Sequence, residues 1–249
     1  MVSSTKPEVI YPDSDGKPMA DNTIQFRWMT VIYYNLQWLF ADDAKVFVAG
    51  DLLWYPVEGN NKIRQAPDVM VAFGVSKGDR GSYQQWKEAN IAPQVVWEIL
   101  SPGNTQTEMN KKLIFYDRYG VEEYYIYDPQ KNDISGWLRS SARLEVIDPM
   151  DNWVSPRLGI RFGLSETELQ LYRPSGEQFA DYLEISRRLE LAQAKAEQAE
   201  NRAEQAENRA EQAENRVQEA ENRAEEEKRR AERLAERLRA AGIDPEAID

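Results

Sequence analysis

The sequence predicts a mixed α/β (α+β) fold, in which a mixed central sheet is flanked by helices and followed by one long C-terminal helix. Three observations support this prediction. A helix-like segment comes first, and strand-like segments with one further helix follow it as far as residue 172. With 41% hydrophobic and 10% aromatic residues, the chain can form a sizeable core. From about residue 187 the aromatic residues disappear, and a seven-residue repeat of Ala, Glu, Gln and Arg follows.

The first elements are an arm and a helix. Residues 1–19 contain three prolines and predict no regular structure. Residues 21–41 have helical spacing, and Asp21 or Asn22 can cap the start of the helix. The residues expected near its inner face are Ile24, Trp28, Val31, Ile32, Asn35 and Leu39.

Strands and a second helix are predicted next. Residues 105–119 form a helix, because Thr105 and Glu108 have the spacing of a capping box and Gly120 suits the C-terminal stop. The segment 76–91, between the predicted strands 66–75 and 92–100, is polar and has no clear period. The predicted strands before this helix are 45–56 (interrupted at Gly50), 66–75 and 92–100; those after it are 121–129 and the hairpin segments 134–139, 143–148, 160–163 and 168–172.

The C-terminal repeat predicts a coiled coil. "AEQAENR" recurs with a period of seven from Ala196, so alanine dominates the a and d positions and each layer buries little apolar area. Arg202 occupies a g position and Glu207 the following e position, a spacing that pairs opposite charges between parallel helices rather than within one helix. We therefore expect a homodimer or homo-oligomer assembled through this segment, with a single solvated helix as the alternative.

Composition excludes several kinds of site. The chain has no cysteine and no histidine, which removes thiolate and imidazole metal ligands and the Ser-His-Asp and Cys-His mechanisms. A metal site must therefore use oxygen ligands, which favours Mg²⁺ or Mn²⁺. The net charge of −12 counts against a strongly basic nucleic-acid-binding surface. The first residues lack a secretion signal and no apolar run is long enough for a membrane span, so we expect a cytoplasmic protein without a membrane partner.

Two carboxylates occupy predicted strands. Strand alternation places Glu98 on one face with Val96 and Leu100, although an unpaired carboxylate is costly to bury. Asp68 follows Pro67 at the start of another strand. If the two strands are neighbours, both groups can converge on one cation, which compensates buried carboxylates. The alternatives are an edge-strand glutamate at a solvated rim and an aspartate that belongs to a turn.

A lysine on the second helix completes the candidate site. At 100° per residue, Lys112 falls within the apolar stripe of this helix, whereas Lys111 lies roughly opposite. An ammonium group on a packing face suggests nearby anions, and a lysine that snorkels to the rim is the alternative. Two carboxylates, a divalent cation and a lysine suit hydrolysis of a phosphodiester.

Other candidates are weaker. Asp51 is either a third acidic group or a turn residue. The loop "KGDRGSY" (77–83) is either a contact to a phosphate backbone or a solvated loop. Five tryptophans are expected in the core rather than as base-stacking platforms: Trp28, Trp38, Trp54, Trp86 and Trp97.

Several ordered segments resemble a known family. "GDLLWYP", "APDVMVAFGV", "GDRGSYQQW", "VVWEILSPGNT", "KKLIFYDRYGVEEYYIYDP" and, more loosely, "SPRLGIRF" are similar to the Uma-type endonucleases of the restriction-endonuclease-like PD-(D/E)XK superfamily. The resemblance covers residues 20–175 and implies a restriction-endonuclease-like fold with a Mg²⁺-dependent nuclease site.

By position, Asp68 matches the first acidic residue of the superfamily motif and Glu98 the second. The motif lysine ordinarily stands two residues after the second acid, where this chain has Leu100. Lys112 matches a lysine displaced to the following helix. Some superfamily members also use an acidic residue of the first helix, for which Asp21 and Gln25 are the inward candidates.

These observations lead to two hypotheses. The first is a Mg²⁺-dependent DNA endonuclease in which Asp68 and Glu98 hold the metal and Lys112 assists. The alternative is a non-catalytic, nuclease-like scaffold or protein-interaction module assembled by its coiled coil, which the acidic charge favours. The expected domains are an arm (1–19), a nuclease domain (20–180), a coiled-coil helix (181–241) and a C-terminal tail (242–249).

Overall fold

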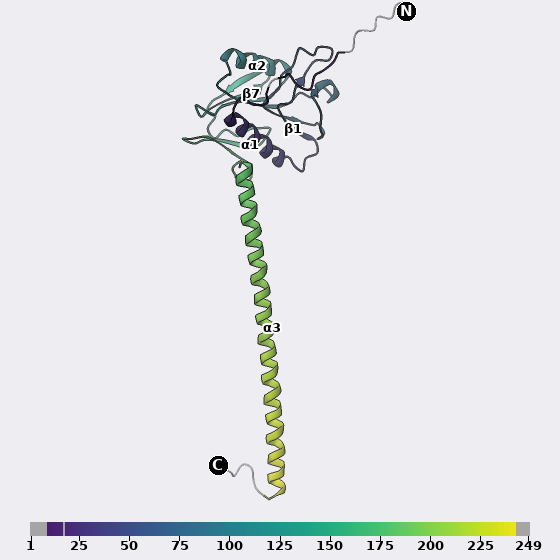
Figure 1. Ribbon diagram of the computed structural model, residues 1–249, viewed down its shortest axis with the longest axis vertical. Coiled ribbons are helices and arrows are strands. Elements are labelled where there is room, and N and C mark those ends of the chain that lie inside the picture. The colour runs from purple at the N-terminus through teal and green to yellow at the C-terminus, as the bar shows by residue number, and fades with distance from the viewer. Residues whose placement is uncertain (1–8, 17, 243–249) are drawn as a thin grey trace, which may run out of the picture. The chain divides into compact units, whose positions relative to one another are not determined.

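The computed structural model describes residues 9–16 and 18–242 (Figure 1). The chain divides into two compact units, Met1–Glu184 and Ile185–Asp249. Residues 1–8 and 17 of the predicted arm, and residues 243–249 of the predicted tail, lie outside the described residues.

The elements follow the order predicted from the sequence. The helices are α1 (Thr23–Leu39), the short 3₁₀ helix η1 (Gln85–Lys87), α2 (Gln106–Tyr119) and α3 (Tyr182–Ala240). The strands are β1 (Val46–Gly50), β2 (Trp54–Tyr55), β3 (Val69–Phe73), β4 (Tyr83–Gln84), β5 (Val95–Ile99), β6 (Glu123–Asp128), β7 (Asp133–Ser140), β8 (Arg143–Ile147), β9 (Arg161–Leu164) and β10 (Leu169–Tyr172).

The central sheet has six strands in the order β1-β3-β5-β6-β7-β8. Strands β5 and β6 are parallel and connected through α2, whereas the other neighbours in this sheet are antiparallel. Strands β9 and β10 form a separate antiparallel pair, and β2 and β4 a short parallel pair. The mixed α/β class with helices on a mixed sheet is therefore confirmed. Strand β4 and helix η1 lie in the polar segment for which no element was predicted.

Each face of the sheet is covered by a helix, α1 on one side and α2 on the other (Figure 1). Strand alternation separates the two cores. In β5, Val95 and Trp97 join the core beneath α1, whereas Val96 joins the core beneath α2. The next residue on the α2 side is Glu98, so the candidate acidic group lies under α2.

Helix α1 is rotated slightly from its predicted orientation. Asn22 is its N-cap and accepts a hydrogen bond from the backbone N–H of Gln25. Gln25 is buried, whereas Ile24, which was expected on the inner face, is 43% exposed. The physical reason is a long-range contact, because the Gln25 amide donates to the backbone carbonyl of Ile99 at 2.9 Å.

Three of the five tryptophans expected in the core are buried, namely Trp28, Trp54 and Trp97. Trp86 is only partly buried, and the prediction for Trp38 is wrong. Trp38 is 55% exposed and lies outside the core, where its ring packs beneath the guanidinium of Arg173, 3.5 Å from the ring centroid.

Helix α3 confirms the predicted long C-terminal helix. It has 59 residues, and none of them is buried. Its alanine seam therefore remains open to solvent within a single chain. In the part of the chain that the structure describes, no helix combines the length and the apolar character needed to cross a membrane.

Candidate active site

Asp68 lies at the junction between Pro67 and β3, next to the central strand β5. The antiparallel register pairs Val69 with Trp97, so continuing it by one residue places Asp68 opposite Glu98. The Asp68 side chain accepts a hydrogen bond from the backbone N–H of Ile99 at 2.6 Å and is buried. Asp68 is therefore more than a turn residue, because its carboxylate bonds to the neighbouring strand.

Glu98 is held inside the sheet. Strand β5 has a neighbour on each side, and Glu98 is only 2% exposed. The interpretation of Glu98 as an edge-strand residue at a solvated rim is therefore wrong. A carboxylate this deeply buried requires partners, and helix α2 supplies two of them.

Lys112 is the first partner. Helix α2 begins with the predicted capping box of Thr105 and Glu108, and its second turn places the Lys112 Nζ 2.7 Å from Glu98 Oε2. Lys111 is exposed, as predicted. The Lys112 side chain is only 18% exposed and ion-paired, so the snorkelling alternative is wrong. Burial lowers the pKa of Lys112, but the carboxylates of Glu98 and Asp68 outweigh it and raise the pKa above its usual value.

Tyr116 is the second partner, and its role was not predicted from the sequence. Its hydroxyl donates to Glu98 Oε1 at 2.5 Å, and its ring is fully buried. Burial, together with the Glu98 carboxylate, raises the pKa of Tyr116 well above its usual value, so the hydroxyl remains a donor. Its spacing of four residues from Lys112, on the same face of a helix, is the signal that could have identified it.

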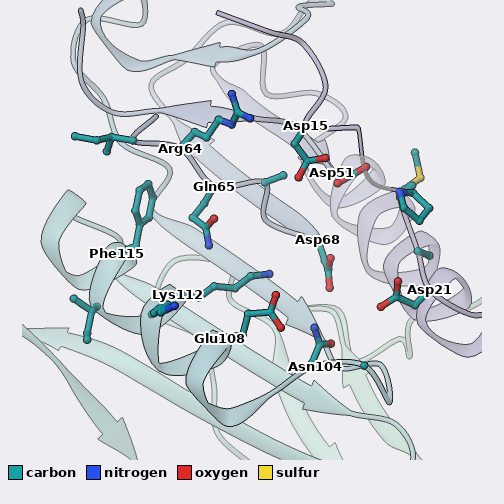
Figure 2. Close-up of a pocket in the computed structure, with 18 of the residues that line it drawn as sticks. Asp15, Asp21, Asp51, Arg64, Gln65, Asp68, Asn104, Glu108, Lys112 and Phe115 are labelled. Carbon is teal, nitrogen blue, oxygen red and sulfur yellow. The ribbon is translucent and has the colours of Figure 1, made fainter. Parts of the chain in front are cut away.

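Asp68 and Lys112 line an open cleft of about 660 Å³ between α2 and the start of α1, and Glu98 is bonded to Lys112. Figure 2 shows Lys112 and Asp68 pointing toward one another across this cleft, with Asp51 and Asp15 close to each other on the side of Asp68. Burial and the Glu98 carboxylate raise the pKa of Asp68 to about 8. Burial and the Asp15 carboxylate raise the pKa of Asp51 to about 6. The cleft therefore concentrates carboxylates around a single buried lysine.

Asp51 is both a turn residue and an acidic group of the cleft. Asp51 directly follows the end of β1, and its φ angle of 47° is in the left-handed region of backbone conformation. Its backbone N–H donates to the carbonyl of Asp68 at 3.2 Å, and its side chain lines the cleft. Asp51 therefore combines the two roles that were predicted as alternatives, a turn residue and an acidic group.

Asp21 and Gln25 also line the cleft, and both tie α1 to the carboxyl end of β5. The Asp21 carboxylate accepts a hydrogen bond from the Ser101 hydroxyl at 2.6 Å, and its backbone N–H donates to the Gln25 side chain at 2.8 Å. Gln25 in turn donates to the carbonyl of Ile99. These contacts hold the backbone next to Glu98 in place.

The loop 77–83 has a structural role that accounts for its cations. Lys77 Nζ donates to the carbonyls of Phe40 and Ala41, just after α1. Arg80 pairs with Glu88 at 2.7 Å. The contact to a phosphate backbone considered for this loop therefore has no support, since both cations already have partners.

The site offers a divalent cation carboxylate oxygens only from a small set of side chains. Within residues 9–16 and 18–242, no group of three or more Asp or Glu side chains is placed to enclose a metal ion. The two candidate ligands are Asp68 and Glu98, and Mg²⁺ is commonly bound by one or two carboxylates while it keeps several waters. A carboxylate has about four lone-pair sites, of which Glu98 uses two and Asp68 one. Oxygen ligands with free lone pairs therefore fit Mg²⁺ or Mn²⁺.

Two family models match parts of the chain. Residues 19–172 match the Uma2 family, whose description is "Putative restriction endonuclease". Residues 183–239 match a family described as "Alanine-zipper, major outer membrane lipoprotein". No curated protein matches the chain.

Among solved structures, the chain is similar to one described as "a putative nuclease belonging to DUF820" from Anabaena variabilis. The two are 19% identical, the match covers 57% of this chain and 78% of that chain, and the TM-score is 0.41. Because the Uma2 match spans more than half of the 249 residues, the chain belongs to the Uma2 family.

Proposed function

We propose that this protein is a Mg²⁺-dependent endonuclease that hydrolyses DNA phosphodiester bonds, with Mn²⁺ as an alternative metal. The observation that carries the proposal is that Asp68 and Lys112 line one cleft while Lys112 is paired with the buried Glu98. These groups come from two neighbouring strands and the following helix, and Lys112 is 2.7 Å from Glu98. The membership in a family described as restriction endonucleases supports the same reaction class.

Asp68 and Glu98 are the residues proposed to hold the cation. Both are buried, and the residues that fix them are the backbone of Ile99 for Asp68 and the Tyr116 hydroxyl for Glu98. When bound, a divalent cation stabilises negative charge on a phosphoryl oxygen and makes water a better nucleophile at neutral pH.

Lys112 is proposed to assist catalysis at the mouth of the cleft. Its ammonium carries three donors, and one of them is used by Glu98. The remaining donors can orient an attacking water or stabilise the charge that develops on the phosphoryl group. Tyr116 is proposed as a positioning residue, because its hydroxyl bonds to the Glu98 oxygen that Lys112 does not use.

Helix α3 is proposed to assemble the protein as a homodimer or homo-oligomer. Its alanine seam is exposed in the single chain, and the segment matches an alanine-zipper family. The spacing of Arg202 and Glu207 suits charge pairs between parallel helices.

The same observations favour a second candidate, a non-catalytic scaffold. A scaffold needs the exposed seam of α3 but no cation, and no cluster of three carboxylates for a metal occurs in the described residues. Calorimetric titration with Mg²⁺ separates the two functions. The nuclease requires binding that is lost in Asp68→Ala and Glu98→Ala, whereas a scaffold does not require this binding.

Plasmid cleavage tests the reaction itself. We expect the wild-type protein to nick or linearise plasmid DNA with Mg²⁺ and to be inactive in EDTA. The single variants Asp68→Ala, Glu98→Ala and Lys112→Ala should each lose cleavage, while Lys87→Ala, which alters an exposed lysine outside the cleft, retains most of it. Equal residual cleavage in the wild type and all variants would indicate a contaminating nuclease and would refute the proposal.

A further inference from the structure

We propose that one wall of the cleft is a track for the phosphates of the DNA strand that flank the cleaved bond. The proposal rests on the proposed nuclease function and names the residues that hold its substrate. The track consists of Lys62 and Arg64, which precede β3, and Lys111 and Arg118 of α2. All four line the same cleft as Asp68 and Lys112.

Most of the acidic residues of the cleft lie on other elements than its cations. The cations of the track come from residues 62–64 and from α2, whereas Asp15, Asp21 and Asp51 come from the arm, the start of α1 and the end of β1. Glu108 is the one acidic residue that α2 contributes to the described lining. Figure 2 shows Arg64 and Lys112 on one side of the cleft, with Asp21 and Asp51 on the other. A polyanion bound along the basic wall therefore avoids most of the carboxylates.

Three cations of the track are available to a ligand. Lys62, Lys111 and Arg118 are exposed, and within the described residues no ion pair includes them. Among the other cations of the first unit that the structure describes, most have partners, as Lys77 and Arg80 do. Unpaired cations gathered at one wall of a protein with a net charge of −12 favour an anionic ligand at that place.

The spacing of the track suits a strand better than a single phosphate. Lys111 and Arg118 are seven residues apart on α2, which is about 10 Å along one face of the helix. Phe115 lies between them on the same face and also lines the cleft, so it presents an aromatic side chain beside the cations. A wall of this length can contact several consecutive phosphates, and such contacts position a nucleic acid without reading its sequence.

The test is the salt dependence of DNA binding by the full-length protein. A short fluorescein-labelled duplex is titrated in EDTA between 50 and 200 mM salt, so that binding is measured without cleavage. The slope of log K against log salt is negative, and each lost phosphate contact reduces its magnitude by about 0.9. We expect the combined variant Lys62→Gln, Lys111→Gln and Arg118→Gln to lose about 2.7 from this slope.

The matched control is Lys87→Gln, because Lys87 is also exposed but does not line this cleft. The control should keep the wild-type slope. An unchanged slope in the triple variant, or no salt-dependent binding by the wild-type protein, would overturn the track. Failure of the nuclease proposal looks different: the track variants then lose binding as expected, but the wild-type protein cleaves no DNA with Mg²⁺.

Discussion

Replacing Lys112 with methionine removes the cation beside Glu98 while keeping a long side chain on α2. The Glu98 carboxylate is 2% exposed and its distance to the lysine is 2.7 Å. Removing one partner of a buried ion pair costs about 3–5 kcal/mol, because the other charge is left uncompensated. The Lys112 side chain is 18% exposed to the cleft, so water can replace part of the lost interaction. We therefore expect a loss of about 3 kcal/mol in the free energy of unfolding.

The same substitution should cost much less when Glu98 is already glutamine. Glu98→Gln removes the charge but keeps an oxygen that can accept from Tyr116. In that background no carboxylate remains at this position, so Lys112→Met should cost less than about 1 kcal/mol. The double-mutant cycle should then give a coupling energy of about 2 kcal/mol between the two side chains.

Urea unfolding in EDTA, followed by tryptophan fluorescence at a fixed protein concentration, measures this cycle. All seven tryptophans precede residue 187, so the signal reports on the first unit and not on α3. The four proteins should share one m-value, which shows that they unfold by the same transition. A coupling energy below about 0.5 kcal/mol would refute the claim that Glu98 depends on Lys112 for its burial.

Three further predictions follow from other parts of the chain. Tyr116→Phe leaves one oxygen of Glu98 without its buried donor, so DNA cleavage should slow about tenfold, the equivalent of about 1.4 kcal/mol; an unchanged kcat would argue against positioning. Asp128 accepts hydrogen bonds from the backbone N–H groups of residues 130 and 131. Burial raises the pKa of Asp128, but Lys131 and these hydrogen bonds outweigh burial and hold the pKa below the usual 3.8. Its ionised form therefore stabilises the fold above pH 3.8, and this stabilisation is lost as the pH falls through the lowered pKa. Accordingly, Asp128→Asn should cost about 1 kcal/mol at pH 7 and almost nothing well below the lowered pKa; an equal cost at both pH values, measured by urea unfolding, would contradict this. Deleting residues 187–249 should reduce the mass measured by light scattering to that of a monomer, and an unchanged mass would exclude the coil as the oligomerisation element.

Two periodicities made the main juxtaposition predictable. Strand alternation assigned Glu98 to the face of Val96, and the helical period assigned Lys112 to the inner face of α2. Because α2 directly connects the parallel strands β5 and β6, it must cross one face of the sheet. In the structure this is the face that carries Glu98. Local patterns sufficed because all the residues concerned lie within one strand–helix–strand unit.

Contacts between distant segments were not predictable in this way. The rotation of α1 depends on Gln25 bonding to Ile99, a residue of β5, and no local period contains this information. The contact of Trp38 with Arg173, which belongs to the last part of the first unit, likewise has no local signal. The role of Tyr116 was missed for a different reason, since a tyrosine in an apolar stripe packs as a core residue whether or not its hydroxyl has a partner.

The most direct test of the central claim is a crystal soaked in Mn²⁺, with diffraction data collected for the anomalous signal of manganese. The account predicts an anomalous peak within coordination distance of both Asp68 and Glu98, and its disappearance in Asp68→Asn. A cleft without a peak, or a peak bound by other residues, would contradict the assignment of these two carboxylates as the metal ligands.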